Sequence, residues 1–340
     1  MNAKQIIFPT VNKAELIEHP LPELAPHQVM VKTAVSTISC GTERANITGD
    51  PNVSIMSGAD VSFPRSSGYS SAGVVVAVGD AVTDVKVGDR VAMFWSKHQN
   101  YNIVDEQSVV KIEHDEIGFD TAAMCFIASF SMSAIRKTRL EMGESAIVMG
   151  LGILGIIAVK LLRVAGAMPI IAVDPNPDRR EAALKSGADF AFDPFEEGFV
   201  EKVKAVSGGG VNVAIEVTGV GAGFNQALDC LKKFGRVTLL GCTRNSDFKV
   251  DYYRKIHAPG ITVIGANTAA RPEHESYPGY FTHKDDIASI LRLVAGGRLD
   301  LASLVAETHS PTECEEVYRR LVEEKDFPIA VQFDWSRLEE

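Results

Sequence analysis

Three glycines near the middle of the chain have the spacing of a turn that binds a dinucleotide. Gly150, Gly152 and Gly155 form a G-x-G-x-x-G pattern between the apolar runs Ser145–Met149 and Ile153–Ala165. In such a turn the first glycine permits a tight bend and the second lets the backbone approach a pyrophosphate. The third lets helix and strand pack closely. The start of the helix then faces the phosphate charge, so the pattern predicts a dinucleotide site.

A carboxylate follows at the distance that ribose recognition requires. Asp174 stands nineteen residues after Gly155, where its side chain can accept hydrogen bonds from both ribose hydroxyls. Because a carboxylate repels a 2′-phosphate, the pattern predicts NAD rather than NADP. Arg179 and Arg180 are close enough to weaken that preference, although an arginine can also stack on adenine. The alternative is an α/β domain with a tight turn and no nucleotide.

The elements around this motif follow a regular rhythm. From Ser145 onward, runs typical of strands alternate with runs typical of helices, which predicts a doubly wound α/β domain with a parallel sheet, the Rossmann architecture. The expected strands are Ser145–Met149, Pro169–Val173, Val211–Val217 and Arg236–Leu240, and the expected helices are Ile153–Ala165, Pro177–Ser186 and Gly223–Lys232.

The first third of the chain has a different pattern. Val29, Val31, Thr33 and Val35 alternate with intervening residues as in a half-buried strand, and short strands with glycine and proline punctuation predict a small β-barrel. Further expected elements are a strand at Ala72–Gly79, a turn over Val85–Val91, helices at Asp285–Ala295 and Pro311–Glu324, and a last strand at Ile329–Phe333. Since 340 residues is long for one core, we expect two domains, 1–120 with 283–340, and 121–282.

Composition narrows the range of partners. The net charge is −10 and no basic block interrupts it, which argues against nucleic acid and anionic membrane surfaces and favours a small-molecule substrate. The longest apolar stretches are too short to span a bilayer, and the N-terminus lacks the features of a signal peptide. The five cysteines are scattered without a CxxC pair, so a reducing cytoplasm is the expected location.

Several landmarks together resemble one family over nearly the whole chain. They are Ser39-Cys40-Gly41-Thr42-Glu43, Gly68 to Gly73, Val87-Gly-Asp-Arg-Val91, the glycine motif, Glu216-Val-Thr-Gly219 and Gly235 to Gly241. The chain resembles the medium-chain dehydrogenase/reductases, in the branch of zinc-containing alcohol and polyol dehydrogenases. The resemblance implies a GroES-like β-barrel catalytic domain, a Rossmann cofactor domain and an active site in the cleft between them. It also implies a homodimer or homotetramer built on the strand Ile261–Ala266.

The residues expected to hold NAD combine the motif with positions that the resemblance supplies. They are Gly150, Gly152, Ile153, Leu154, Asp174, Arg179, Thr218, Gly241 and Ala266.

The sequence departs from the family where zinc would be held. Members with a catalytic zinc carry a cysteine matching Cys40, then Gly-His-Glu, then a distal cysteine or glutamate. Here the second motif reads Gly68-Tyr69-Ser70, and the distal position falls at or beside Phe126, next to Cys125. Zinc needs three protein ligands chosen from cysteine, histidine and carboxylate. No cysteine between Val91 and Val104 could hold a structural zinc. We therefore predict that no metal is bound.

Without zinc, side chains must handle the substrate oxygen and its proton. Thr42 matches the family's proton-relaying hydroxyl, or it caps a helix over Glu43–Ile47. Tyr69 replaces the zinc histidine and could donate to the substrate oxygen, or it could be a packed aromatic residue. His98 could serve as a base, or it could be a histidine on a surface loop.

Five residues are candidates for substrate contacts. Trp95 follows Val91 at a place that lines the substrate site in relatives, and Cys40 lies beside the proposed relay. The polar loop from Asn267 to Tyr280 contains Asn267, Arg271 and His274, which suit a ligand rich in hydroxyls because each buried hydroxyl needs a partner. The alternative for this loop is a solvated crossover.

These features predict an NAD-dependent oxidoreductase that transfers hydride between nicotinamide and a secondary alcohol or ketone. The expected substrate is a polyol, sugar or similar polyhydroxylated compound, and the expected mechanism uses no catalytic zinc. One alternative is a zinc-independent quinone or enone reductase, although that group usually prefers NADPH. Another is a nucleotide-binding protein that kept the fold and lost the chemistry.

Overall fold

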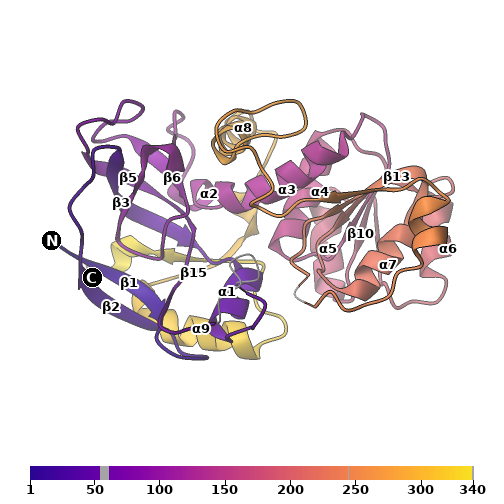
Figure 1. Ribbon diagram of the computed structural model, residues 1–340, viewed down its shortest axis with the longest axis horizontal. Helices are drawn as coiled ribbons and strands as arrows, with labels where there is room; N and C mark the ends of the chain where they lie inside the picture. Colours follow the sequence, from indigo (N-terminus) through magenta and orange to yellow (C-terminus); the bar gives the residue numbers. More distant parts are fainter. Residues whose placement is uncertain (54–60, 244, 339–340) are drawn as a thin grey trace. The chain divides into compact units, whose positions relative to one another are not determined.

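The computed structural model describes residues 1–53, 61–243 and 245–338, which form two compact units (Figure 1). Unit 1 comprises Met1–Ile127 and His283–Glu340, and unit 2 comprises Ala128–Thr282. The sequence placed the first boundary at 120/121, seven residues too early. The short helix α2 (Phe119–Ala122) packs against strands of unit 1, so the chain leaves this unit only within helix α3 (Cys125–Thr138).

Unit 1 is built on two sheets that are largely antiparallel. In the described residues the smaller sheet has the order β2-β1-β4 and the larger the order β15-β16-β3-β5-β6-β8, with β7 also paired to β3. The strands are β1 (Asn2–Phe8), β2 (Glu15–Pro20), β3 (Gln28–Thr37), β4 (Arg65–Ser66), β5 (Ser70–Val78), β6 (Arg90–Phe94), β7 (Tyr101–Asp105), β8 (Val109–Lys111), β15 (Val305–His309) and β16 (Ala330–Asp334). The pairing of β16 with β3 brings the C-terminal segment into the N-terminal sheet.

The helices of unit 1 complete its core. Helix α9 (Cys314–Glu323) follows a 3₁₀ turn at Pro311–Glu313, and helix α8 (His283–Ala295) begins the C-terminal segment. Tyr318 of α9 packs edge-on against Phe8, with ring centroids 4.9 Å apart. Helix α1 (Cys40–Ile47) contributes Ile47 to the same buried cluster. The predicted helices at 285–295 and 311–324 are therefore present, with ends shifted by at most three residues.

Unit 2 contains the predicted doubly wound parallel sheet. Its strand order is β11-β10-β9-β12-β13-β14, and every pairing between neighbours is parallel. The chain order reverses beside β9, the kind of switch point at which α/β sheets bind ligands. The elements are β9 (Ala146–Met149), α4 (Ile153–Val164), β10 (Ile170–Val173), α5 (Pro177–Lys185), β11 (Phe190–Phe192), α6 (Phe199–Val206), β12 (Val211–Glu216), α7 (Gly221–Cys230), β13 (Leu231–Leu239) and β14 (Thr262–Gly265).

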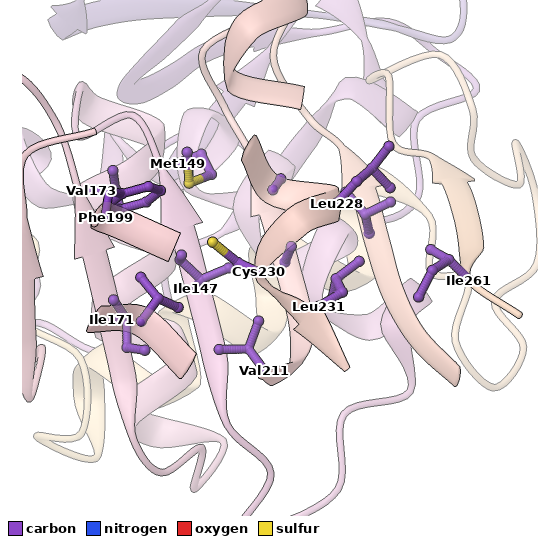
Figure 2. Close-up of a cluster of buried hydrophobic side chains, with 14 residues drawn as sticks. Ile147, Met149, Ile171, Val173, Phe199, Val211, Leu228, Cys230, Leu231 and Ile261 are labelled. Atoms are coloured by element: carbon purple, nitrogen blue, oxygen red, sulfur yellow. The ribbon is translucent and has the colours of Figure 1, made fainter. Parts of the chain in front are cut away.

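The central strands β9 and β10 of this sheet are buried on both faces. Figure 2 shows one face, where Ile147 and Met149 of β9 pack with Phe199 of α6 and Leu228 of α7. The alternate residues of β9 point to the opposite face and have no exposed surface either. Such continuous burial explains why the strands are nearly uniformly apolar in sequence. No helix in the described ranges is long and apolar enough to cross a membrane.

Candidate functional site

The glycine motif forms the turn between β9 and α4. Gly150 has a φ of +93°, and its amide donates to the carbonyl of Val173 at 2.8 Å. A Cβ on Gly155 would lie 1.9 Å from the carbonyl oxygen of Gly150, so helix and turn pack too closely for any side chain there. A Cβ on Gly152 would meet no atom within 4 Å. The outer two glycines are required by the protein itself, whereas the middle one leaves room for a ligand.

Asp174 links the end of β10 to this turn. Its carboxylate accepts from the amides of Leu151 at 2.8 Å and Asn176 at 2.9 Å, and its exposed fraction is 5%. A carboxylate offers about four acceptor positions, so two remain for ribose hydroxyls. The Arg179 guanidinium lies 3.9 Å from the same carboxylate. Arg180 instead donates to the carbonyl of Asp174 at 2.7 Å, which stabilises the turn after β10.

A second carboxylate organises the ends of β12 and β13. Glu216 is buried and accepts from the amide of Thr218 at 2.8 Å, from the Thr218 hydroxyl, and from the amide of Gly219 at 3.2 Å. Burial raises the pKa of Glu216 despite these hydrogen bonds. A Cβ on Gly241 would lie 2.5 Å from the amide of Gly219, and one on Gly150 would lie 3.1 Å from Thr218 Cγ2. Thr218 and Gly241 therefore meet beside the glycine turn, as predicted residues of one cofactor site should.

The edge of the sheet continues into the polar loop. Ala266 is buried, and its amide donates to the carbonyl of Leu239 at 3.1 Å. Lys137 of α3 donates to the carbonyls of Gly265 at 3.0 Å and Ala270 at 2.6 Å. A buried lysine of α3 thus ties the beginning of the loop to unit 2.

The three predicted substrate residues of this loop have different environments. The Arg271 guanidinium donates to the carbonyl of Ser129 in α3, so its observed partner lies within the protein. Asn267 is exposed, but its side-chain oxygen accepts from the amide of Ala269 at 2.9 Å and closes a local turn. The His274 side chain is 92% exposed. The loop is therefore pinned at Arg271 and solvated at His274, which combines features of both interpretations of its sequence.

Aromatic rings gather in unit 1 around Tyr69, one of the positions where the sequence led us to expect a zinc ligand. Tyr69 meets Phe126 edge to face, with centroids 5.5 Å apart, and Trp95 meets Phe126 at 5.0 Å. The ring of His283 lies 5.0 Å from Phe126 and 5.7 Å from Trp95. Trp95 remains 50% exposed and has a φ of +57°, a strained conformation for a bulky residue. This group, named here the aromatic cluster, also includes Phe94.

Both hydroxyl candidates are now placed. The Tyr69 hydroxyl donates to Ser39 Oγ, so Tyr69 is a packed aromatic residue and a hydrogen-bonding one at once. Thr42 lies inside α1, which begins at Cys40 with Ser39 as its N-cap residue. The interpretation of Thr42 as a helix cap is wrong because the helix begins two residues before it. Its half-buried side chain leaves the relay role available.

His98 is neither on a surface loop nor accessible as a base. It has no exposed surface, and its ring nitrogens contact Ser36 Oγ at 2.7 Å and the Glu43 carboxylate at 3.1 Å. A base must come within hydrogen-bond reach of the proton that it removes. The buried position of His98 corrects both interpretations of its sequence, because neighbouring residues of unit 1 surround the imidazole completely.

The residues present do not fit a zinc ion. Cys40 is the one expected ligand retained, and its thiol lies 3.9 Å from the carbonyl of Pro328. Cys125 is buried against the carbonyl of Thr121, and burial raises the pKa of its thiol to about 12, which disfavours the thiolate that binds metal. Within the described ranges no three His, Cys, Asp or Glu side chains are placed to hold a metal. No catalytic step is therefore derived through zinc.

Three residues of unit 1 escaped prediction from the sequence. The first is Glu43. It lies one helical turn before the buried Ile47 in α1, and this spacing could have indicated that Glu43 is buried. Ser39 precedes Cys40 directly, but nothing in the pattern shows that Tyr69 reaches it. His283 lies far along the chain from the rings it contacts, so only the fold reveals its place.

Comparisons with known proteins agree with this architecture. Residues 25–134 match the alcohol dehydrogenase GroES-like domain, and residues 154–282 match the zinc-binding dehydrogenase domain. An L-threonine 3-dehydrogenase of Pyrococcus abyssi is 27% identical over 280 residues, covering 74% of this chain and 79% of the relative. An (R,R)-butanediol dehydrogenase of Bacillus subtilis is 26% identical over 92% of this chain and 94% of its own length.

Solved structures show the same fold. The crystal structure of 2R,3R-butanediol dehydrogenase from Bacillus subtilis superposes with a TM-score of 0.81 at 22% identity, covering 98% of this chain and 99% of that one. A short chain alcohol dehydrogenase from Escherichia coli CFT073, complexed with NADH, gives a TM-score of 0.84 at 17% identity with the same coverage. Both comparisons span the GroES-like unit and the Rossmann unit.

Proposed function

This chain belongs to the medium-chain dehydrogenase/reductase family, in its zinc-type alcohol dehydrogenase-like branch, and from that premise we propose that it is an NAD-dependent oxidoreductase acting on a secondary alcohol or its ketone. The observation that carries the proposal is the cofactor site of unit 2. There a Cβ on Gly152 would meet no protein atom within 4 Å. The amide of the preceding residue, Leu151, donates a hydrogen bond to the Asp174 carboxylate.

Each residue of this site has a distinct task toward NAD. The turn at Gly150–Gly155 and the start of α4 receive the pyrophosphate, and Asp174 accepts the ribose hydroxyls. Arg179 lies beside Asp174 and is available to the adenine face. When bound, the nicotinamide exchanges a hydride with the carbon that bears the substrate oxygen. The Asp174 carboxylate opposes a 2′-phosphate, which supports NAD over NADP.

The aromatic cluster supports a mechanism without catalytic zinc. Tyr69 stands at one position expected to supply a zinc ligand, the distal one is expected at or beside Phe126, and the two rings lie edge to face. A metal would have polarised the substrate oxygen. In the proposed mechanism the Tyr69 hydroxyl turns its single proton from Ser39 Oγ to that oxygen. Thr42 accepts the proton of the substrate alcohol and passes its own proton to solvent water, while the hydride goes to the nicotinamide. Both groups are hydroxyls, so neither requires a change of charge on the protein to act.

We propose a polyhydroxylated substrate. Relatives named for threonine, butanediol and sorbitol act on compounds in which a polar group neighbours the reacting hydroxyl. Exposed Trp95 offers an apolar surface for the carbon skeleton, and Asn267 and His274 offer polar contacts. Cys40 remains a candidate contact beside Thr42.

We also propose that the protein is a homodimer or homotetramer in the cytoplasm. Strand β14 forms one edge of the parallel sheet and pairs with β13 alone in the described part of the chain. Its Val263 is 39% exposed, and an exposed β-branched edge readily pairs with a second copy. Free thiols at all five cysteines suit a reducing compartment. Light scattering that gives a monomer mass near 36.7 kDa at micromolar concentration would contradict the assembly.

Two measurements on the purified protein test the function. The first is elemental analysis for zinc, and the second is a dehydrogenase screen of sorbitol, 2,3-butanediol, L-threonine and cyclic polyols with NAD and NADP. We expect less than one tenth of a zinc per chain and NAD-linked oxidation of at least one compound. One zinc per chain that is lost in Cys40→Ser would overturn the zinc-free mechanism. NADPH-linked reduction of quinones would favour the enone reductase alternative, and NAD binding without turnover would favour a non-catalytic protein.

A further inference from the structure

The Tyr69 hydroxyl has a defined partner inside unit 1. It donates to Ser39 Oγ, and Ser39 is 8% exposed. Ser39 is the N-cap residue of α1, a position at which a serine hydroxyl usually accepts from a helix amide. Here the Ser39 side chain makes no such capping bond. The hydroxyl is therefore directed to Tyr69 rather than used to stabilise the helix.

A buried carboxylate fixes the backbone of Ser39. Glu43 Oε1 accepts from the Ser39 amide at 2.8 Å, and the amide of Glu43 donates to the Ser39 carbonyl at 2.8 Å. Glu43 is 2% exposed and also accepts from the Tyr318 hydroxyl. Burial, and then the adjacent Glu43 carboxylate, raises the pKa of Tyr318, so its phenol remains a donor. These bonds hold the N-cap residue at one place.

His98 completes the support through a directed chain of hydrogen bonds. The Trp335 indole, which can only donate, donates a hydrogen bond to Ser36 Oγ at 2.9 Å. Ser36 can then donate to His98 Nδ1 at 2.7 Å, and Nε2–H is left to donate to Glu43 at 3.1 Å. Each donor in this series of hydrogen bonds, from Trp335 to Glu43, therefore has an acceptor, as buried polar networks require.

His98 also packs against the backbone next to Tyr69. The His98 amide donates to the carbonyl of Ser67 at 2.9 Å. Gly68 has a φ of +83°, and a Cβ there would lie 2.7 Å from Cγ of the His98 ring. The imidazole therefore lies directly against the backbone that leads into Tyr69. His98 therefore contacts Glu43, which holds Ser39, and Gly68, which precedes Tyr69.

We propose that Ser39 is a positioning residue for Tyr69, and that the buried Glu43–His98 pair holds the Ser39 and Tyr69 hydroxyls at a fixed position relative to each other. The proposal rests on the function proposed above, because it concerns the hydroxyl that replaces the metal. When the Tyr69 proton turns to the substrate oxygen, the Ser39 hydroxyl donates to the phenol oxygen in its place. A tyrosine without this partner would lose its orientation toward the substrate oxygen, and small misplacements at such sites lower turnover strongly. Burying a carboxylate and a histidine beside the site is then the means of fixing that orientation.

The first test needs no substrate. The protein is labelled with 3-fluorotyrosine, and the ¹⁹F resonance of Tyr69 is assigned by its absence in Tyr69→Phe. We expect this resonance to shift in Ser39→Ala and Glu43→Gln, and to return close to its original position in Ser39→Thr. Ser70→Ala is the matched control, since this neighbouring buried hydroxyl donates to the Ala123 carbonyl at 2.6 Å. A Tyr69 resonance unmoved by Ser39→Ala would overturn the proposal.

The second test is a double-mutant cycle with the fastest substrate of the screen. Ser39→Ala should lower kcat about tenfold with unchanged KM and unchanged NAD affinity, and it should add nothing in a Tyr69→Phe background. Additive losses, or full activity in Ser39→Ala when Tyr69→Phe is impaired, would contradict positioning alone. Unchanged kcat in Tyr69→Phe would overturn both this proposal and the catalytic role of Tyr69, while leaving the NAD dependence intact. Melting temperatures of all variants identify any loss due to unfolding.

Discussion

The two units of this protein differ in how their candidate sites are built. The cofactor site of unit 2 is made of backbone amides, glycines and one carboxylate at the carboxyl ends of parallel strands. The aromatic cluster of unit 1 is made of side chains on a scaffold of antiparallel strands and α1. Backbone geometry is fixed by the fold, whereas a side chain can be exchanged without moving the backbone. This difference explains how a chain can retain one site of its family and replace another.

The contrast also appears in what each site tolerates. In unit 2, Gly155 and Gly241 leave no space for a Cβ, so substitutions there act on the fold as well as on the ligand. In unit 1, Tyr69 and Phe126 both contact Trp95, and Phe126 also contacts His283, so these side chains form a small aromatic core.

The largest effect should come from the glycine turn of unit 2. Gly155→Ala places a Cβ 1.9 Å from a backbone oxygen, so it should destabilise the protein by roughly 3 kcal/mol and abolish NADH binding. Gly152→Ala meets no protein atom within 4 Å, so it should keep the melting temperature and lose NADH affinity alone. Calorimetry and NADH fluorescence titration of both variants measure the difference. Equal melting temperatures for the two variants would refute the assigned roles.

The second prediction reverses the replacement in unit 1. Tyr69→His combined with Phe126→Cys should, together with Cys40, restore three ligands of the types that zinc prefers. We expect about one zinc per chain after dialysis against zinc and then buffer, against almost none in the wild type. The matched control is the same pair of substitutions with Cys40→Ser. Failure of the double variant to bind zinc while remaining folded would show that the scaffold of unit 1, and not only its side chains, has changed.

The third prediction concerns cofactor choice. Asp174→Ala removes the carboxylate that opposes a 2′-phosphate and leaves Arg179 nearby. We expect NAD(H) affinity to fall at least about tenfold, since the loss of even one hydrogen bond to a charged group costs about 1.5 kcal/mol, and NADP(H) affinity to rise. Titration by intrinsic tryptophan fluorescence measures both constants. Tighter NADP(H) than NAD(H) binding by the wild type would reverse the assignment.

The smallest effect lies outside both sites. The hydrogen bonds from Arg320, and then His309, lower the pKa of Glu307 to about 2 from an ordinary value of 4.5. Because the folded pKa is depressed, the ion pair stabilises the protein above pH 4.5, and this contribution is lost as the pH falls toward 2. For a partly exposed pair we expect about 1 kcal/mol. The free energies of urea unfolding of Glu307→Gln and wild type should differ at pH 7, and the difference should shrink steadily as the pH falls from 4.5 toward 2, with NADH binding unchanged at pH 7.

The sequence predicted the features that depend on neighbouring residues. The glycine motif, Asp174 and the alternating runs of unit 2 are local patterns, so their strands and helices were located within a few residues. The alternation at Val29–Val35 likewise identified β3, whereas the short strands β1, β2 and β15 gave no comparable signal. The prediction that zinc ligands are missing at Tyr69, and at or beside Phe126, rests on residue types in the same way. Residue identity alone states which donors are available.

The tertiary structure decided how distant side chains meet. No local pattern indicates that His98 is buried against Glu43 and Ser36, because His98 is far from both along the chain. Nor could it show that Tyr69 donates to Ser39, or that His283 joins the rings of Trp95 and Phe126. Local periodicity encodes burial along one element. Contacts between elements depend on the strand order and packing of the whole unit, which a single sequence pattern does not specify.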